Sequence, residues 1–294
     1  MVKELELSTN EKELIISGLK EGIRLDGRGI DDFRSLKITL GPEYGRSEVK
    51  LGDTKVLAKV SCEVARPYPD RPNEGILTLN TELSPMAFAG LEPGRPSEEE
   101  VLVSRILEKA IKINRAVDVE GLCIVANELA WSIHVDVHFL DNDGNIIDAA
   151  CIAAISALSH FRRPDVTVIG EDVTIHPVDQ RNPVPLSIHH TPICVTFAFF
   201  ENGDLWVVDP SLKEEQIRRG DMIIAINNHK EICVLSKAGG LPLEMHTIIQ
   251  CSKLAASKVD WVREKIQDAI ANAAEVEKRC YLILLLFLFI LYEF

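Results

Sequence analysis

Positive charge is scarce in this chain. Its 294 residues include 32 lysines and arginines against 45 aspartates and glutamates, which gives a formal net charge of −13 at pH 7. A field of this sign repels free nucleic acid, because protein affinity for nucleic acids comes largely from phosphate contacts. The composition therefore argues against a stand-alone nucleic-acid binder, unless a local basic patch or a basic partner supplies those contacts.

Paired cysteines are also missing. The seven cysteines are scattered, and none forms a C-x-x-C pair: Cys62, Cys123, Cys151, Cys194, Cys233, Cys251 and Cys280. This pattern predicts neither a zinc site nor a disulfide framework, and most of them lie in apolar runs typical of buried, reduced thiols in the cytosol or nucleus. The adjacent His189 and His190 would point to opposite faces of a strand, and no glycine-rich phosphate loop is present. We therefore predict no metal and no cofactor.

The chain lacks an N-terminal apolar signal core, and its one long apolar run lies at the other end. Residues 281–292 (YLILLLFLFILY) are continuously apolar or aromatic, but a spanning helix needs about 20 such residues. We expect no membrane partner, although a membrane-tethered adaptor is a competing hypothesis. A buried strand is one interpretation of the run, and translation of non-coding sequence is the one we favour.

Regular patterns predict an α+β chain in two halves. Capping boxes at Ser8 and Ser97 begin two helices, the first over residues 8–23 and the second with Val101, Leu102, Ile106, Ala110 and Ile113 facing a core. Strict alternation over 131–140 predicts a half-buried strand, and the Ala-rich segment 146–161 predicts a buried helix. Further strands are expected at 36–40, 46–51, 55–60, 193–200, 205–208, 222–226 and 231–235, with a last helix over 243–279.

A proline-rich, charged stretch at 163–190 suggests the boundary between the halves. We therefore divide the chain into an N-terminal helix and turn, a first domain, a second domain and an apolar tail, at residues 1–30, 31–165, 166–279 and 280–294.

Two groups of side chains are candidates for chemistry. Arg105, Lys109 and Lys112 share one face of the second helix and would suit phosphates, although a solvated face paired with Glu108 is favoured by the spacing alone. Asp209 and Glu215 follow a strand, where two acids can hold Mg²⁺ or transfer a proton. A structural cap is the favoured interpretation of that pair from spacing alone.

Seven segments together resemble the RNase PH family. They are 24–28 (RLDGR), 52–56 (GDTKV), 92–95 (EPGR), 142–150 (NDGNIIDAA), 161–166 (FRRPDV), 185–190 (PLSIHH) and 208–210 (VDP). The resemblance implies the RNase PH fold, with two βαβα-type halves of which the first is similar to domain 2 of ribosomal protein S5.

More narrowly, the segments resemble a ring subunit of the eukaryotic RNA exosome. That resemblance implies a hexameric ring with other RNase PH-like subunits, S1/KH cap subunits and a separate catalytic nuclease. RNA would pass through the ring for 3′-to-5′ degradation, in rRNA maturation and mRNA decay. It also implies a place in the nucleus, nucleolus and cytoplasm.

The family has a phosphorolytic branch and a non-catalytic branch. Active members carry a Ser or Thr and an Arg just before the Ala-rich helix, where this chain has Ile146 and Ile147. They also carry two adjacent arginines at the start of the preceding helix, where this chain has Glu98 and Glu99. Because phosphorolysis needs cations to hold phosphate against a phosphodiester, the resemblance implies the non-catalytic branch. An active phosphorolytic exoribonuclease is the alternative.

The resemblance also assigns roles to the two candidate groups. Asp209 matches the family's first acid and Glu215 stands where a second Asp is usual, so this pair is a remnant with a structural role. Arg105 and Lys109 match basic positions that face RNA in the non-catalytic branch, which reverses the solvated-face interpretation. We therefore predict no catalytic residue and two RNA-binding residues.

Overall fold

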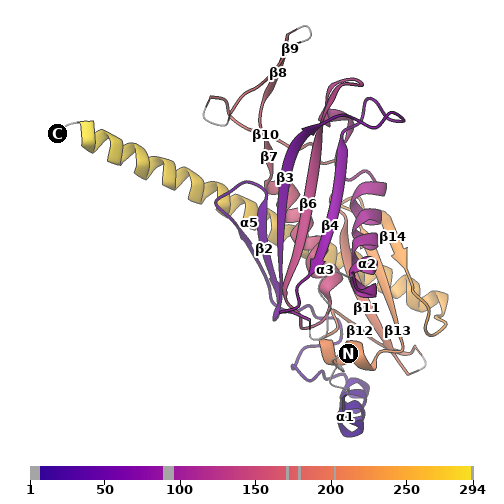
Figure 1. Ribbon diagram of the computed structural model, residues 1–294. Helices are drawn as coiled ribbons and strands as arrows, with labels where there is room; N and C mark the ends of the chain where they lie inside the picture. Colours follow the sequence, from indigo (N-terminus) through magenta and orange to yellow (C-terminus); the bar gives the residue numbers. More distant parts are fainter. Residues whose placement is uncertain (1–6, 89–95, 170–171, 178–179, 202, 293–294) are drawn as a thin grey trace.

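The computed structural model describes residues 7–88, 96–169, 172–177, 180–201 and 203–292, with 172 and 276–292 as backbone only. It is an α+β fold in which a layer of helices lies between two sheets (Figure 1). The family-like segment 92–95 and residue 202, between the strands predicted at 193–200 and 205–208, lie outside the described residues.

The first sheet has six strands in the order β1-β2-β3-β6-β4, with β5 also pairing with β6. All pairs are antiparallel except β4 with β6. The alternation predicted for 131–140 is confirmed, because Ile133, Val135 and Val137 are buried while His134 and Asp136 are only half-buried. The strands are β1 (Leu36–Leu40), β2 (Arg46–Leu51), β3 (Thr54–Ala65), β4 (Ile76–Leu83), β5 (Cys123–Val125) and β6 (Leu129–Asp141).

The second sheet is antiparallel, in the order β12-β11-β13-β14. Its strands are β11 (Ile193–Phe200), β12 (Leu205–Val208), β13 (Gly220–Ile226) and β14 (Ile232–Ser236), which confirms the four strands predicted here and pairs them as two hairpins. All eight residues of β11 are buried. One reason is that Ile15 and Leu19 of α1 (Thr9–Lys20) pack with Phe200 and Val207, on the far side of the sheet from the helix layer.

Helix α3 (Ile146–His160) is the centre of the molecule. It contacts β2 and β3 of one sheet and β11 of the other, and its residues from Asp148 to Leu158 are all buried. Its many alanines allow the two sheets to approach closely on both sides. Helices α2 (Glu98–Leu107) and α5 (Met245–Tyr292) pack beside it, so one hydrophobic core runs through both halves.

The shorter elements lie before β5, in and beside the predicted boundary, and between β12 and β13. The stretch 163–190 contains the hairpin of β8 (Val166–Ile169) and β9 (Asp172–Ile175). The others are η2 (Glu120–Leu122), β7 (Arg162–Arg163), β10 (Val184–Pro185) and α4 (Leu212–Ile217). The division into domains at residues 30, 165 and 279 stays a prediction.

Two helices differ from the predicted ones in their ends. Ser8 caps α1 as predicted and forms the capping box with Glu11, but the helix ends at Lys20 and Ile23 is exposed. Helix α5 continues to Tyr292, so the strand interpretation of residues 281–292 is wrong. Within the described residues, no helix is both long and apolar enough to cross a membrane.

The core face of the helix after Ser97 was predicted only in part, because Ile106 and Ala110 are buried as expected but the other three predicted residues are not. Val101, Leu102 and Ile113 are 51%, 38% and 69% exposed. The face against the core is instead formed by Val103, Ile106, Leu107, Ala110 and Ile111. This set follows the i, i+3, i+4 spacing of one helical stripe, whereas the predicted set mixed residues from both sides of the helix.

A π-helix, η1 (Glu108–Ile113), continues α2. The chain then reverses at Arg115, whose φ of 53° lies in the left-handed region that favours glycine. Because a π turn carries more residues than an α turn, it changes which side chains face outward beyond Glu108. This helps to explain why Ile113 points to solvent instead of the core.

The corrected stripe makes a specific prediction about stability. Ile111→Ala should lower the free energy of unfolding by about 2–5 kcal/mol, because it leaves a cavity at a fully buried position. Ile113→Ala is the matched control and should change it by less than about 0.5 kcal/mol. Urea denaturation followed by circular dichroism measures both, and equal losses would contradict the assignment of the core face.

Candidate functional site

Asp209 lies in a turn after β12 and is completely buried. Its φ of 51° is left-handed, which is uncommon for a residue other than glycine. Arg34 donates its backbone N–H to Oδ2 at 2.8 Å and its Nη2 to Oδ1 at 2.9 Å. Arg28 Nη1 donates to Oδ2 at 2.9 Å, and Asn145 Nδ2 donates to Oδ1 at 2.6 Å. Both carboxylate oxygens are therefore engaged inside the protein.

The backbone of the same turn is held by Arg24. Its Nη1 donates to the carbonyl of Val208 and its Nη2 to that of Asp209, both at 2.8 Å. Arg24 is itself buried and forms an ion pair with Glu214 of α4. The RLDGR segment therefore supplies two of the three arginines that surround Asp209.

Arg34 also connects the two halves of the chain. Its Nη1 donates to the carbonyl of Asp143 at 2.8 Å and its Nη2 to that of Gly144 at 3.0 Å. Gly144 has a φ of 84°, and a Cβ there would lie 2.5 Å from the backbone N of Leu212. The turn before α3 therefore packs directly against the start of α4, with no space for a side chain at Gly144.

The charge of Asp209 is fixed by these contacts. Burial acts to raise its pKa, but hydrogen bonding and the charge of Arg34, together with Asn145, outweigh burial and hold the pKa below its usual value. The carboxylate is therefore ionised and already neutralised by its own arginines.

Glu215 lies beside Asp209 but has a different environment. Its Oε1 accepts a hydrogen bond from the backbone N–H of Asn145 at 2.9 Å, so Asn145 touches both acids. Burial raises the pKa of Glu215 to about 7, and the nearby charge of Glu99 adds to this, against the opposite effect of Arg218 at 3.4 Å. The structure therefore brings the predicted acidic pair together at the start of α3.

The residues around this pair are poor in free cations. Glu98 and Glu99 are exposed in the first turn of α2, and Ile146 and Ile147 are half-buried against the core. Four arginines contribute to the site, and each forms an ion pair with a carboxylate: Arg24 with Glu214, Arg28 and Arg34 with Asp209, and Arg218 with Glu215. An incoming phosphate would meet glutamates here.

Asp148 is a further acid that sequence reasoning did not single out. It is fully buried in α3 and accepts hydrogen bonds from the Thr196 N–H at 2.9 Å, the Thr196 hydroxyl at 2.8 Å and Asn145 Nδ2 at 2.9 Å. Burial raises its pKa from 3.8 to about 7. Asp148 therefore links α3 to β11.

Sequence reasoning gave no roles to Arg24, Arg28, Arg34 or Asn145. Arg24, Arg28 and Asn145 lie in the segments 24–28 and 142–150, which carry part of the family resemblance. The resemblance did not indicate which residues these three side chains contact. Arg34 stands outside all seven segments. Its partners Asp143, Gly144 and Asp209 lie 109 to 175 residues away in the sequence, a distance that no local pattern reveals.

The basic row lies further along α2 and in η1, after the first-turn residues Glu98 and Glu99. Arg105, Lys109 and Lys112 are all exposed. Among the described residues, none of their nitrogens lies within 4.0 Å of a carboxylate oxygen, so the predicted pairing with Glu108 is not formed. Arg105 also borders a groove of about 420 Å³ between α2 and β4. The row consists of exposed charges without ion pairs of their own.

The histidines and cysteines do not form a metal site in the part of the chain that the structure describes. His138 Nδ1 lies 3.1 Å from Glu82 Oε2, and His134 Nε2 lies 3.1 Å from Ser132 Oγ. Cys151, Cys194 and Cys251 are buried thiols as expected, whereas Cys62, Cys123 and Cys233 are only half-buried.

Asp148 makes stability depend on pH in a defined direction. Because its folded pKa lies above its usual value, the folded chain binds a proton that the unfolded chain releases between about pH 4 and pH 7. Its contribution to stability therefore falls as the pH rises through that window. Asp148→Asn should remove this loss, since the uncharged amide can accept from the Thr196 N–H and Asn145 through its oxygen and donate to the Thr196 hydroxyl through its NH2.

Urea denaturation at pH 5 and pH 8 measures the effect. At each pH, the free energy of unfolding of the unmodified chain is subtracted from that of the variant. This difference should be larger at pH 8 than at pH 5 by on the order of 1–3 kcal/mol. Glu215 titrates in both chains and cancels in the comparison. An unchanged pH dependence in the variant would contradict the assignment.

Comparisons with known proteins agree with this geometry. Residues 32–164 match domain 1 of the 3′ exoribonuclease family (RNase PH), and residues 190–258 match domain 2. The Exosome complex component rrp45 of Schizosaccharomyces pombe is 47% identical over 96% of this chain and 97% of its own length. The Exosome complex component RRP45 of Bos taurus is 49% identical over 94% of this chain, which spans 63% of that longer protein.

A solved structure gives the same result in three dimensions. A chain of the Archaeoglobus fulgidus exosome with RNA bound to the active site superposes with a TM-score of 0.77 and 30% identity, over 87% of this chain and 97% of that one. The fold, both family domains and the near full-length similarity agree, and the chain belongs to the RNase PH family of 3′ exoribonuclease-like proteins.

Proposed function

We propose that this chain is a non-catalytic ring subunit of an RNA exosome, which supports 3′-to-5′ RNA degradation by building part of the RNA channel. The proposal is supported by the similarity to exosome components over nearly the whole chain. Its partners would be other RNase PH-like subunits in a hexameric ring, S1/KH cap subunits, a separate nuclease and RNA. Its places of action would be the nucleus, nucleolus and cytoplasm, in rRNA maturation and mRNA decay.

One observation carries the non-catalytic part of the proposal. Asp209, the acid that matches the family's first acid, has no exposed surface and is bound by Arg28, Arg34 and Asn145. A catalytic acid must reach the proton that it transfers, within hydrogen-bond distance of a reacting group. Asp209 instead acts as an internal tie between parts of the fold.

Electrostatics support the same conclusion. Phosphorolysis brings an anion against an anion and proceeds only where cations and N–H donors neutralise the developing charge. Here Glu98 and Glu99 are exposed in the first turn of α2, and Glu99 is close enough to raise the pKa of Glu215. Ile146 and Ile147 offer neither a donor nor a charge.

The contact with RNA is assigned to the basic row. Arg105 and Lys109 are one helical turn apart, exposed and without ion pairs among the described residues. Cations of this kind are available to phosphates, in contrast to the arginines around Asp209. A local row of this sort also resolves the conflict between RNA contact and a net charge of −13, because the rest of the channel would come from partner subunits.

An active phosphorolytic exoribonuclease is the alternative function. The observation in its favour is that Glu215, with a pKa of about 7, has the pKa of a general acid or base at neutral pH. The acid alone does not supply the phosphate clamp, so this alternative needs a ring neighbour to contribute the missing cations.

The function is tested by purifying native complexes through an N-terminal tag on the endogenous chain. We expect a discrete assembly of several different RNase PH-like subunits. We also expect no phosphate-dependent trimming of RNA by this chain, alone or paired with a ring neighbour whose own site is disabled. Trimming is measured with a 5′-labelled single-stranded RNA, with and without inorganic phosphate.

The ring assignment and the non-catalytic assignment can be contradicted independently of each other. A monomer or simple homodimer would overturn the ring assignment. Phosphate-dependent trimming by the pair would establish the alternative, and its loss in Glu215→Gln would identify the acid responsible.

If the basic row binds RNA, reversing the charge of Arg105 in α2 and of Lys109 in η1 should weaken RNA binding. Arg105→Glu with Lys109→Glu should weaken RNA binding by the assembled ring about ten-fold or more at moderate salt, because two phosphate contacts become repulsions. The slope of the logarithm of affinity against the logarithm of salt concentration should fall as well. Fluorescence anisotropy with labelled oligouridine measures both quantities.

A matched control changes the same net charge elsewhere. Lys253→Glu with Lys265→Glu reverses two exposed lysines of α5 and should leave RNA binding unchanged. If both double variants bind RNA equally, the row on α2 is an ordinary solvated face.

A further inference from the structure

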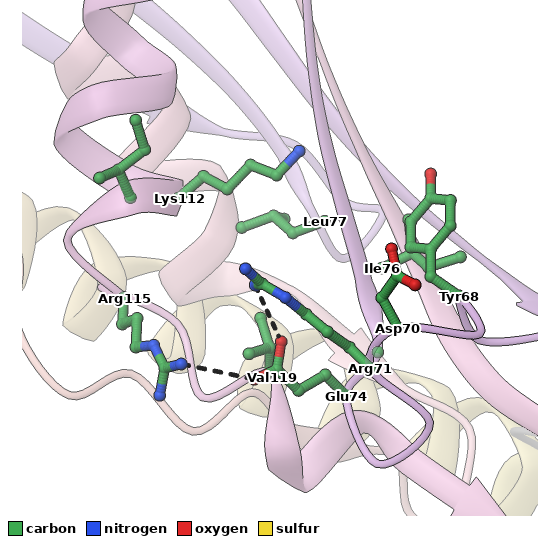
Figure 2. Close-up of a pocket in the computed structure, with 11 residues that line it drawn as sticks. Tyr68, Asp70, Arg71, Glu74, Ile76, Leu77, Lys112, Arg115 and Val119 are labelled. Atoms are coloured by element: carbon green, nitrogen blue, oxygen red, sulfur yellow. Dashed lines mark hydrogen bonds and ion pairs between the residues drawn. The ribbon is translucent and has the colours of Figure 1, made fainter. Parts of the chain in front are cut away.

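A second basic feature lies at the far end of the row. A pocket of about 530 Å³ opens between the loop before β4, the end of η1 and the segment that follows it (Figure 2). The side chains that matter for its chemistry are Tyr68, Arg71, Glu74, Leu77, Lys112 and Arg115. Its volume is in the range of pockets that hold small organic ligands such as a nucleotide.

The charged groups of the pocket leave one cation without an ion pair among the described residues. Glu74 alone pairs with two guanidinium groups, Arg71 at 3.2 Å and Arg115 at 3.4 Å. The lining therefore contains three cations against the two carboxylates of Asp70 and Glu74. Glu120 lies 3.8 Å from Arg115 outside the lining. Three cations therefore face three carboxylates, and Lys112 is the lining cation left without an ion pair among the described residues, so it is available to an anion.

Lys112 connects the pocket to the basic row. It is the last cation of the row and also lines the pocket, where Figure 2 shows its side chain extended above Leu77. No carboxylate oxygen of the described residues lies within 4.0 Å of its nitrogen. The π-helix that carries Lys112 sets the direction of this side chain.

Arg115 occupies a costly backbone position. Its φ of 53° is one that glycine adopts more easily, directly after the last turn of the helix. The side chain that it places there reaches Glu74 across the pocket (Figure 2). A glycine would satisfy the backbone better but would remove the guanidinium.

The remaining lining suits a base. Tyr68 is 62% exposed at the rim, and the interior is formed by apolar side chains, Ile76, Leu77 and Val119. An exposed aromatic ring beside cations is the combination with which proteins hold single-stranded nucleic acid, because a base stacks on the ring while the cations bind phosphate.

We propose that this pocket binds one nucleotide of single-stranded RNA, at the end of the path that Arg105 and Lys109 begin. Tyr68 stacks on the base, and Lys112, the lining cation without an ion pair among the described residues, binds the adjoining phosphate, while Glu74 holds Arg71 and Arg115 nearby. This inference rests on the proposed function, because it places the pocket on the RNA path of the assembled ring. An acidic protein segment would meet the same cations but would not need the exposed ring.

Photocrosslinking is the direct test. The reconstituted ring that contains this chain is irradiated with single-stranded oligouridine carrying 4-thiouridine at successive positions, and crosslinked peptides are identified by mass spectrometry. We expect one thiouridine position to crosslink to the peptide with Tyr68, and neighbouring positions to crosslink to α2. Tyr68→Ala should abolish the first crosslink and weaken binding up to about ten-fold, whereas Tyr68→Phe should keep both.

Arg115→Gly tests the charge without damaging the fold. It should weaken RNA binding while leaving the thermal midpoint equal or higher, because glycine relieves the left-handed backbone. Lys230→Gly is the matched control, since Lys230 is also an exposed cation with a positive φ of 63° but does not line the pocket. It should leave RNA binding unchanged.

The outcomes separate this inference from the proposed function. Crosslinks to α2 without any to Tyr68, together with unchanged binding in Tyr68→Ala and Arg115→Gly, would overturn the pocket and leave the ring function intact. Loss of a partner subunit from the native complex of Tyr68→Ala, with RNA binding unchanged, would assign the pocket to a protein segment instead. Absence of crosslinks to the whole chain would overturn both.

Discussion

The buried ion-pair cluster around Asp209 is the interaction on which the rest of the structure depends. Arg24 and Arg28 come from the N-terminal segment, Arg34 precedes the first sheet, and Asp209 ends the first hairpin of the second sheet. Arg34 also holds the carbonyls before α3, so one guanidinium joins both halves of the chain. Removal of one partner from such a buried pair typically costs about 3–5 kcal/mol, because it strands the other charge.

This constraint determines whether the acid of the turn after β12 is available for chemistry. Where the acid is free and flanked by cations, the turn after β12 can take part in chemistry. Here the acid is ionised, enclosed and neutralised, and the exposed charges at the adjacent helix start are glutamates. The free cations lie instead along α2 and η1, on the outside of the helix layer. The chain thus carries exposed acidic residues in the first turn of α2 and exposed basic residues further along α2 and η1.

Local patterns predicted most of the elements and failed where the environment decided. The alternation of 131–140 and the Ala-rich run of α3 are strong because burial on one face or on all sides leaves a periodic trace. The core face of α2 was misplaced because Val101, Leu102 and Ile113 are as apolar as the residues that pack inward. The candidate acids and the basic row were found from the sequence, but Arg34 was not, since it has no periodic or motif signal of its own.

The sequence by itself determined the fold class, the family, most of the longer strands and helices along the chain and the positions of the acidic pair and the basic row. Only the tertiary structure decided what those side chains do. Whether Asp209 is reactive depends on three arginines and an asparagine that lie 64 to 185 residues away. Whether Lys112 belongs to a pocket depends on a π turn and on a loop that the chain brings to the same place. Contacts at such separations follow from packing and leave no local pattern in the sequence.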